Sequence, residues 1–316
     1  MKLGLLSTAK INEAVLQAPP AGVEIVAVAS RDGTRAQSYA NEHGIERAHG
    51  SYEALLADEG IDTVYISLPN LLHHEWTLKA IAAGKHVLVE KPYSRRAAEV
   101  EEAWDAAARA GVVVMEALMW RHHPQAALAR SLVDEGAIGR LSQIRTTFGF
   151  LLLDLGNVRM AADLEGGALM DIGCYCISGA RLLAGEPERV FGEQVLGASG
   201  VDVAFHGTLR FPDDVVAQFD ASFTLPQRQR LEAVGDGGTL LLEAPWRSDW
   251  GGRVLVNDEP IDVPAADPYT LELANLRAAI AGEVEPLLGR EDALAQARVI
   301  EALYLSAESG VAVRPA

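Results

Sequence analysis

The chain has 316 residues, of which 49% are hydrophobic and 22% charged, a composition typical of a globular protein with one large or two ordinary domains. Its formal net charge of -17 argues against a nucleic-acid partner or an anionic membrane partner, because like charges repel. No apolar run reaches the roughly 20 residues of a membrane helix, and too few apolar residues follow Met1-Lys2 for a secretory signal, so we expect a cytoplasmic protein.

Short apolar segments alternate with helical patterns through the first third of the chain. The predicted strands are Lys2–Leu6, Val23–Ala29, Thr63–Leu68, His86–Val89 and Val112–Met115. The predicted helices are Thr8–Ala18, Thr34–His43, Tyr52–Ala57, Leu72–Ala83 and Arg96–Ala110, several of which end at glycine or proline. This order is typical of a doubly wound parallel sheet, a Rossmann-type α/β domain whose ligands lie beyond the carboxyl ends of the strands.

The turn after the first strand resembles a dinucleotide-binding turn in its small residues but has lost its glycines. It reads Ser7-Thr8-Ala9-Lys10-Ile11, with Ser7 and Ala9 where two glycines would stand. Small residues still permit close backbone approach, and Ser7 or Thr8 can cap a helix that holds a pyrophosphate. On this pattern alone, a plain helix cap is the favoured interpretation.

The end of the second strand carries information on the cofactor. A dinucleotide fold offers an acid there for the ribose hydroxyls, or a basic residue for a 2′-phosphate. Here Ser30 takes the place of the acid and Arg31 follows, with Arg35 one turn into the next helix. A hydroxyl beside a guanidinium suits a phosphate, so we favour NADP(H) over NAD(H). Asp32 is the rival, because an inward carboxylate would favour NAD.

An apolar strand runs directly into Glu90-Lys91-Pro92. Lysine occurs at only five positions, the last of which is Lys91, and arginine supplies every later basic group. Lysine can release its proton whereas arginine cannot, which favours a working ammonium at the end of this strand. A surface lysine after a strand is the equally weighted alternative.

The earlier strand Thr63–Leu68 ends in a loop, Leu68-Pro69-Asn70, that can press on the ribose or adenine side of a cofactor. We expect His73 and His74, which follow it, to face solvent or bond to loops rather than to act in catalysis.

Basic and aromatic residues mark a domain junction at Trp120–Pro124. Arg121 can reach a substrate oxygen or phosphate, or pair with an acid. His122 and His123 with Glu116 lack the spacing of a metal site, so we predict no metal. Cys174 and Cys176 are too close in sequence for an ordinary bridge, and we expect both to be reduced.

The second half is predicted to be an α+β domain with a large, mostly antiparallel open sheet. Its predicted strands are Leu141–Phe150, Val201–Phe211, Val215–Phe223, Arg230–Val234, Leu240–Ala244 and Val254–Val256, and the helices Tyr269–Ala281 and Glu291–Ser309 follow. We therefore predict a dinucleotide-binding domain over 1–119 and a substrate and oligomerisation domain over 120–316, whose C-terminal helix can pack back on the first domain. One sheet face is available to another subunit, which predicts a homodimer or homotetramer.

The segment Gly166–Tyr175 carries a second group of candidate residues. Asp171 and Tyr175 are four positions apart, so on a helix they share a face, and both follow a glycine pair that permits close backbone approach. A carboxylate and a phenol suit a polyol, because one can hold hydroxyls while the other exchanges a proton. A helix start with an ordinary buried tyrosine fits the pattern equally well.

Three motifs together resemble the Gfo/Idh/MocA oxidoreductase family, in particular its NADP-dependent xylose and dihydrodiol dehydrogenases. They are Glu90–Pro92, the run Met115–Pro124 and the run Gly166–Tyr175. Their order and spacing match over nearly the whole chain, and the missing glycines at Ser7 and Ala9 are the departure.

The resemblance implies hydride transfer between nicotinamide and a hydroxyl-bearing carbon of a sugar or cyclic polyol. It implies Lys91 as the catalytic lysine, Tyr175 as its proton-exchanging partner and Asp171 as a residue that orients substrate; Arg121 and Asn157 are further substrate candidates. The implied cofactor contacts are Ser7, Thr8, Ala9, Lys10, Ile11, Ser30, Arg31, Leu68, Pro69, Asn70, His73, Glu90 and Arg159. From its place in the helix, Arg35 is a further candidate, which either supports the phosphate or faces solvent. The alternatives are dihydrodiol oxidation, ketosugar reduction, or an NADP-binding sensor on the same fold.

Overall fold

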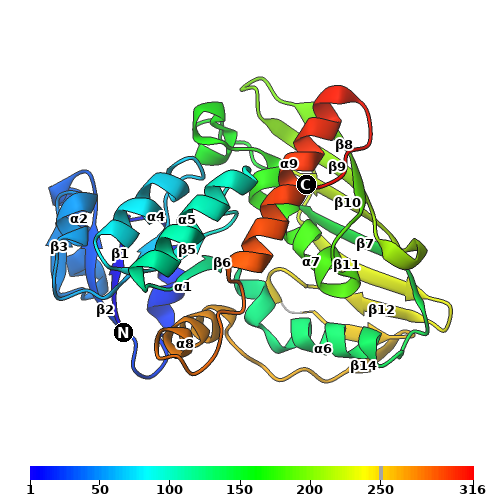
Figure 1. The fold of residues 1–316 in the computed structure, drawn as a ribbon, viewed down its shortest axis with the longest axis horizontal. Coiled ribbons are helices and arrows are strands. Elements are labelled where there is room, and N and C mark those ends of the chain that lie inside the picture. Colours follow the sequence, from blue (N-terminus) through cyan, green and yellow to red (C-terminus); the bar gives the residue numbers. More distant parts are fainter. Residues whose placement is uncertain (249–251) are drawn as a thin grey trace. The chain divides into compact units, whose positions relative to one another are not determined.

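The computed structural model describes residues 1–248 and 252–316, which form two compact units (Figure 1). The first unit comprises Met1–Ser94, Ala98–Met119 and Tyr269–Leu294. The second unit comprises Arg95–Ala97, Trp120–Pro268 and Ala295–Ala316. No helix in the described part of the chain is both long and apolar enough to cross a bilayer.

In the described residues of the first unit, six strands form one parallel sheet in the order β3-β2-β1-β4-β5-β6. The strands are β1 (Lys2–Leu5), β2 (Glu24–Ala29), β3 (Arg47–His49), β4 (Thr63–Ile66), β5 (His86–Glu90) and β6 (Val114–Ala117). The helices are α1 (Asn12–Gln17), α2 (Gly33–His43), α3 (Tyr52–Leu56), α4 (Leu72–Ala82), α5 (Ala97–Ala110) and α8 (Pro268–Ile280). The predicted Rossmann-type sheet is confirmed, and its strand order reverses beside β1, where such folds bind ligands.

In this unit one local prediction is wrong and one strand was not predicted. The helix expected over Thr8–Ala18 begins only at Asn12, because the Ser7 hydroxyl accepts the Ala9 N–H and makes a turn first. The short strand β3 was not predicted, since its three residues are only half-buried and carry no apolar run.

The second unit contains an eight-stranded sheet in the order β14-β13-β12-β11-β7-β10-β9-β8 among the described residues. The strands are β7 (Leu141–Gly149), β8 (Arg189–Leu196), β9 (Asp202–Arg210), β10 (Val216–Ser222), β11 (Arg228–Gly235), β12 (Thr239–Leu242), β13 (Val254–Val256) and β14 (Glu259–Ile261). All neighbours are antiparallel except β7 and β10, so the predicted mostly antiparallel sheet is confirmed.

Helices cover one face of this sheet. They are α6 (Pro124–Asp134), α7 (Cys174–Ala184) and the later part of α9 (Arg290–Ser309). The short helical turns are η1 (Met119–His122), η2 (Val158–Met160), η3 (Ala162–Leu164), η4 (Leu169–Gly173) and η5 (Pro212–Asp214). Ile144 of β7 and Phe205 of β9 are fully buried on the helix side. Tyr304 of α9 packs edge-on against Phe205, which ties this helix to the sheet.

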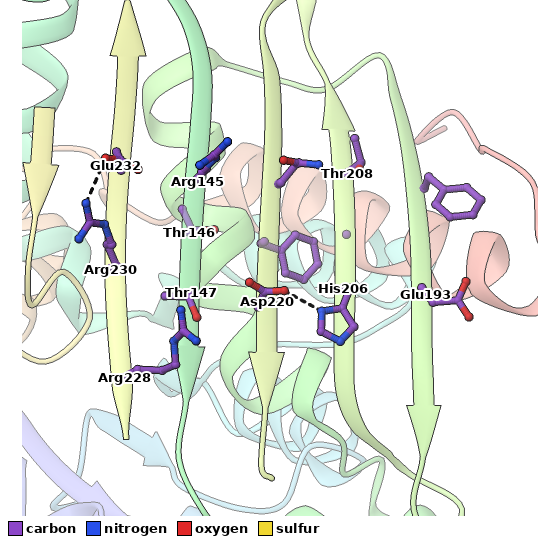
Figure 2. A pocket seen from close by; sticks show the side chains of 14 residues that line it. Arg145, Thr146, Thr147, Glu193, His206, Thr208, Asp220, Arg228, Arg230 and Glu232 are labelled. Atoms are coloured by element: carbon purple, nitrogen blue, oxygen red, sulfur yellow. Dashed lines mark hydrogen bonds and ion pairs between the residues drawn. The ribbon is translucent and has the colours of Figure 1, made fainter. Parts of the chain in front are cut away.

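The opposite face of the sheet carries a polar hollow of about 580 Å³ (Figure 2). It is lined by residues of the five strands β7 to β11, most of them alternate residues, because strand side chains alternate between the two faces. The labelled charged residues are Arg145, Glu193, His206, Asp220, Arg228, Arg230 and Glu232. His206 lies 2.7 Å from Asp220 and Arg230 lies 3.0 Å from Glu232, so charges of both signs are interspersed across this face.

Candidate active site

Lys91 directly follows β5, whose residues Val87, Leu88 and Val89 are completely buried. Lys91 itself is half-buried, and the Lys91–Pro92 peptide bond is cis. The strand therefore carries this side chain to the carboxyl edge of the parallel sheet, where the sequence predicted a working lysine.

Glu90 is held from the neighbouring strand. The Tyr65 hydroxyl of β4 donates a short hydrogen bond to its carboxylate. Burial, assisted by the negative charge of Glu90, raises the pKa of Tyr65 well above its usual value, so the hydroxyl keeps the proton that it donates. The residue before Lys91 is thus fixed by a partner that sequence reasoning missed.

A buried hydrogen-bond network joins the turn after β1 to the end of β4. The Ser7 and Ser67 hydroxyls lie 2.7 Å apart, and the Ser67 hydroxyl donates to the Asn12 Oδ1 atom at 2.6 Å. Asn12 Nδ2 donates back to the Ser7 carbonyl at 2.7 Å. The expected cap of α1 by Ser7 or Thr8 is wrong, because the N-cap residue is Ile11, which makes no side-chain cap bond. Ser7 holds the turn itself instead.

The end of β2 leaves a hydroxyl and exposed arginines beside the sheet edge. Ser30 is buried and accepts the Asp32 N–H. The Asp32 carboxylate accepts the N–H groups of Thr34 and Arg35 at 2.9 and 3.3 Å, so it caps α2. Arg31 and Arg35 are both exposed. Because the Asp32 carboxylate is already used in this cap, Asp32 is a poorer candidate for binding the ribose hydroxyls. Ser30 and Arg31 remain the candidates for binding a phosphate.

His73 joins the loops that follow β4 and β5. It is 1% exposed, and its Nε2 and Nδ1 atoms lie 2.8 and 3.0 Å from the carbonyls of Leu68 and Pro92. Burial lowers the pKa of this imidazole, and the charge of Lys91 lowers it further. His73 is therefore bonded to loops, one of the two expected outcomes, and it connects the loop Leu68–Asn70 to the segment that carries Lys91.

In the second unit, the predicted pair of Asp171 and Tyr175 lies on η4 and α7. The expectation of one regular helix is wrong, because η4 is a π-helical turn and α7 begins after it at Cys174. Such turns widen the helix locally and are common at functional sites. The four-residue spacing therefore does not by itself put both side chains on one face.

Arg159 and Asp171, two residues proposed independently from the sequence, form an ion pair. The Arg159 Nε atom lies 2.6 Å from an Asp171 carboxylate oxygen. Asn157 Oδ1 accepts the Arg159 N–H at 3.1 Å and caps η2. This loop thus holds the carboxylate that was expected to orient substrate.

Aromatic rings surround Tyr175, which is 8% exposed. Its ring centroid lies 5.4 Å from that of Phe148 and 6.2 Å from that of Trp246, and Trp246 lies 5.0 Å from Trp120. Sequence reasoning missed this cluster because its members lie on a strand, a loop and a domain junction. Trp246 and Trp120 are 0% and 1% exposed, so this cluster holds the ring of Tyr175 by packing against it.

Arg121 lies within hydrogen-bond distance of the same helix. Its Nη1 atom is 3.4 Å from the Ser178 hydroxyl, one turn after Tyr175 on α7. Burial, assisted by the charge of Arg121, lowers the pKa of the adjacent His122 to about 3, so His122 carries no charge near neutral pH.

These residues group within each unit. In the first unit, Ser7, Ser30, Leu68, His73, Glu90 and Lys91 lie at or just beyond the carboxyl ends of four neighbouring parallel strands. In the second unit, Arg159 is paired with Asp171, Tyr175 lies on α7, and Arg121 contacts α7 at Ser178. The first group thus lies where parallel α/β sheets bind nucleotides, and the second group lies in the unit with the mostly antiparallel sheet.

Comparison with known proteins gives the family. Residues 4–118 match the oxidoreductase family with an NAD-binding Rossmann fold, and residues 126–241 match the GFO/IDH/MocA C-terminal domain. The chain belongs to the Gfo/Idh/MocA family of oxidoreductases, as its motifs indicated.

Several relatives have named activities. The chain is 39% identical to D-xylose 1-dehydrogenase (NADP(+)) 2 of Haloferax volcanii over 99% of both chains. It is 33% identical to mouse (Mus musculus) trans-1,2-dihydrobenzene-1,2-diol dehydrogenase over 78% of this chain and 73% of that protein. A 3-ketoreductase from Actinomadura kijaniata, solved with NADP and TDP-benzene, has a TM-score of 0.91 and 29% identity over 97% of both chains. These relatives confirm the predicted class, an oxidoreductase.

The buried network at the first turn predicts a joint loss of stability and cofactor affinity. Replacement Asn12→Ala leaves the Ser67 hydroxyl and the Ser7 carbonyl without these partners, and each such buried group costs about 1–3 kcal/mol. We expect urea unfolding to show a free energy of unfolding lower by about 2–4 kcal/mol, and NADPH titration to show about tenfold weaker binding. Gln17→Ala, at an exposed position of the same helix, is the control. Wild-type stability in Asn12→Ala would contradict the prediction.

Proposed function

We propose that this protein is an NADP-dependent dehydrogenase or reductase that transfers a hydride between nicotinamide and a hydroxyl-bearing carbon of a sugar or related cyclic polyol. The observation that supports it best is the position of Lys91, which a buried strand carries to the ligand-binding edge of the parallel sheet. The similarity over 99% of the chain to an NADP-dependent D-xylose 1-dehydrogenase supports the substrate class and the cofactor.

The strand ends of the first unit fit a dinucleotide. The turn Ser7–Ile11 and the loop Leu68–Asn70, together with His73 and Glu90, would hold it, and Ser30 with Arg31 would hold the 2′-phosphate. Arg35 supports that phosphate from α2, and Arg159 lies in the loop proposed to face the nicotinamide and substrate. When bound, the nicotinamide supplies the hydride acceptor for oxidation or the donor for reduction.

Proton transfer is assigned to Lys91 and Tyr175 acting on the same substrate hydroxyl. A free tyrosine has a pKa of about 10, and an ammonium nearby brings it toward the working pH. If both groups approach the same hydroxyl, they titrate as a coupled pair, and either of them can act as the base. Asp171, held by Arg159, binds neighbouring hydroxyls and fixes the reacting carbon.

Two alternatives use the same site. Dihydrodiol oxidation or ketosugar reduction would use the same candidate groups, Lys91, Tyr175 and Asp171, and an NADP-binding sensor would bind the cofactor without turnover. A panel of pentoses, hexoses, sugar phosphates and diols, followed by nicotinamide absorbance with NADP(H) and NAD(H), separates these possibilities. No turnover of any member with intact NADPH binding would favour the sensor.

The predicted cytoplasmic location stays a prediction.

Lys91→Met and Tyr175→Phe test the proposed chemistry. Each removes one of the two proton-carrying groups and keeps much of the side-chain volume, so we expect kcat to fall by about 10²–10⁴-fold while NADPH still binds. Because the groups act as a pair, the double variant is expected to be little worse than either single one. Near-normal turnover in both single variants would remove the proposed site.

Arg31→Ala tests cofactor selection. Loss of a guanidinium–phosphate hydrogen bond costs about 1.5–3 kcal/mol, which predicts a Kd for NADPH higher by about 10–100-fold and an unchanged Kd for NADH in fluorescence titrations. Arg109→Ala, at an exposed position near the end of α5, is the matched control. An initial preference of the wild-type protein for NAD(H) would refute the assignment directly.

We propose in addition that a second copy of the chain covers the polar hollow on the open sheet, giving a homodimer or homotetramer. Arginines and acids alternate across this face, and a twofold axis can pair them. The double substitution Arg228→Glu and Arg230→Glu places like charges there, so we expect sedimentation velocity to show smaller species. Arg109→Glu, a single charge reversal at an exposed position of the first unit, is the control, and an unchanged sedimentation coefficient in the double variant would exclude this face.

A further inference from the structure

We propose that Asp202 is a positioning residue, which anchors from a distant strand the segment that carries Asp171 and Tyr175. The inference rests on the proposed function, because those two residues are its candidate catalytic groups. Asp202 is the first residue of β9 and is 3% exposed. Nothing in its neighbourhood along the chain marks it as functional.

Asp202 supplies the acceptor that the start of η4 lacks. Its Oδ2 atom accepts the N–H of Leu169, the first residue of η4, at 2.7 Å. The first N–H groups of a helix have no partner within it, and Ala168, the preceding residue, makes no side-chain cap bond. A carboxylate 33 positions later in the chain thus fixes the turn that begins two residues before Asp171.

The glycine pair is explained by the same contact. A Cβ atom at Gly167 would lie 2.2 Å from Asp202 Oδ1, and Gly167 has a φ of +126°, which side chains rarely adopt. A Cβ atom at Gly166 would lie 2.3 Å from the Arg159 carbonyl. The close approach that Gly166-Gly167 permits is therefore to the Asp202 carboxylate on one side and to the loop that holds Asp171 on the other.

The second carboxylate oxygen is bound by the last helix. Tyr304 of α9 donates its hydroxyl hydrogen to Asp202 Oδ1 at 3.0 Å, and the Arg95 guanidinium lies 4.2 Å from the centre of the Tyr304 ring. Burial, assisted by Asp202, raises the pKa of Tyr304, so it remains a donor. Glu165, which also faces Tyr304, is paired with Arg96 at 2.5 Å.

The charge of Asp202 opposes folding. Burial raises its pKa to about 6, although the Leu169 N–H, Tyr304 and Arg95 all lower it. Because the native carboxyl holds its proton to higher pH than the unfolded one, its contribution to stability falls as the pH rises between about 4 and 6. A neutral side chain of the same shape would avoid that cost. The ionised carboxylate is, however, the stronger acceptor for the Leu169 N–H.

Asp202→Ala and Asp202→Asn test the anchor by turnover and by hydrogen exchange. We expect Asp202→Ala to lower kcat at pH 8 at least tenfold, to leave the Kd for NADPH within twofold, and to speed amide exchange in the peptide 166–176. Asp202→Asn keeps a weaker, neutral acceptor. The ratio of wild-type to Asp202→Asn kcat is therefore expected to be near one at pH 5 and about three at pH 8, with its midpoint near pH 6. Glu308→Gln, exposed on α9 one turn after Tyr304, is the control for both readouts.

The outcomes separate the anchor from a merely structural role and from the proposed function. Unchanged exchange in the peptide 166–176, or a kcat ratio that does not vary with pH, would overturn the inference. If Asp202→Ala does not fold, the pH dependence of the ratio for Asp202→Asn decides alone. Exchange needs no turnover, so wild-type protein that oxidises or reduces no sugar or diol would end the proposed function while the exchange experiment still tests the anchor.

Discussion

The structure depends on one constraint, which is that buried parallel strands leave polar side chains room only at their ends. Val87, Leu88 and Val89 of β5 are fully buried, so Glu90 and Lys91 are the first residues of that strand able to carry charge. The same holds for Ser7 after β1, Ser30 after β2 and Ser67 after β4. Sheet geometry brings these ends to one edge, so the candidate cofactor-binding and catalytic groups gather there without any local signal that they belong together.

The second unit solves a related problem with contacts between distant segments. Asp171 lies on the π turn η4 and Tyr175 just after it on α7, and the first N–H groups of this turn need acceptors from outside the helix. Arg159 holds Asp171, Asp202 holds the start of the turn, and Tyr304 holds Asp202. Asp202 is costly to bury while charged, and this is the kind of local conflict with stability that is expected near functional groups.

Membership in the Gfo/Idh/MocA family accounts for the two-unit architecture. It does not determine the substrate, which depends on the residues of the site. Its relatives include a xylose dehydrogenase, a dihydrodiol dehydrogenase and a sugar ketoreductase. Phe148, Trp246 and Trp120 form a buried aromatic cluster with Tyr175, and Asp171 and Arg121 are the candidate polar contacts to a substrate.

The sequence by itself determined the class of both sheets, the buried strand that ends at Lys91, and the pairing of motifs that indicates the family. These features depend on hydrophobic periodicity and on residues close together in the chain. Tertiary structure alone decided that Ser67 bonds to Asn12, that η4 is a π turn, and that Asp202 approaches Gly167 and Leu169. The physical reason is distance along the chain: Ser67 and Asn12 are 55 positions apart, and Tyr304 and Asp202 are 102. Only packing brings such partners together, and no local pattern records it.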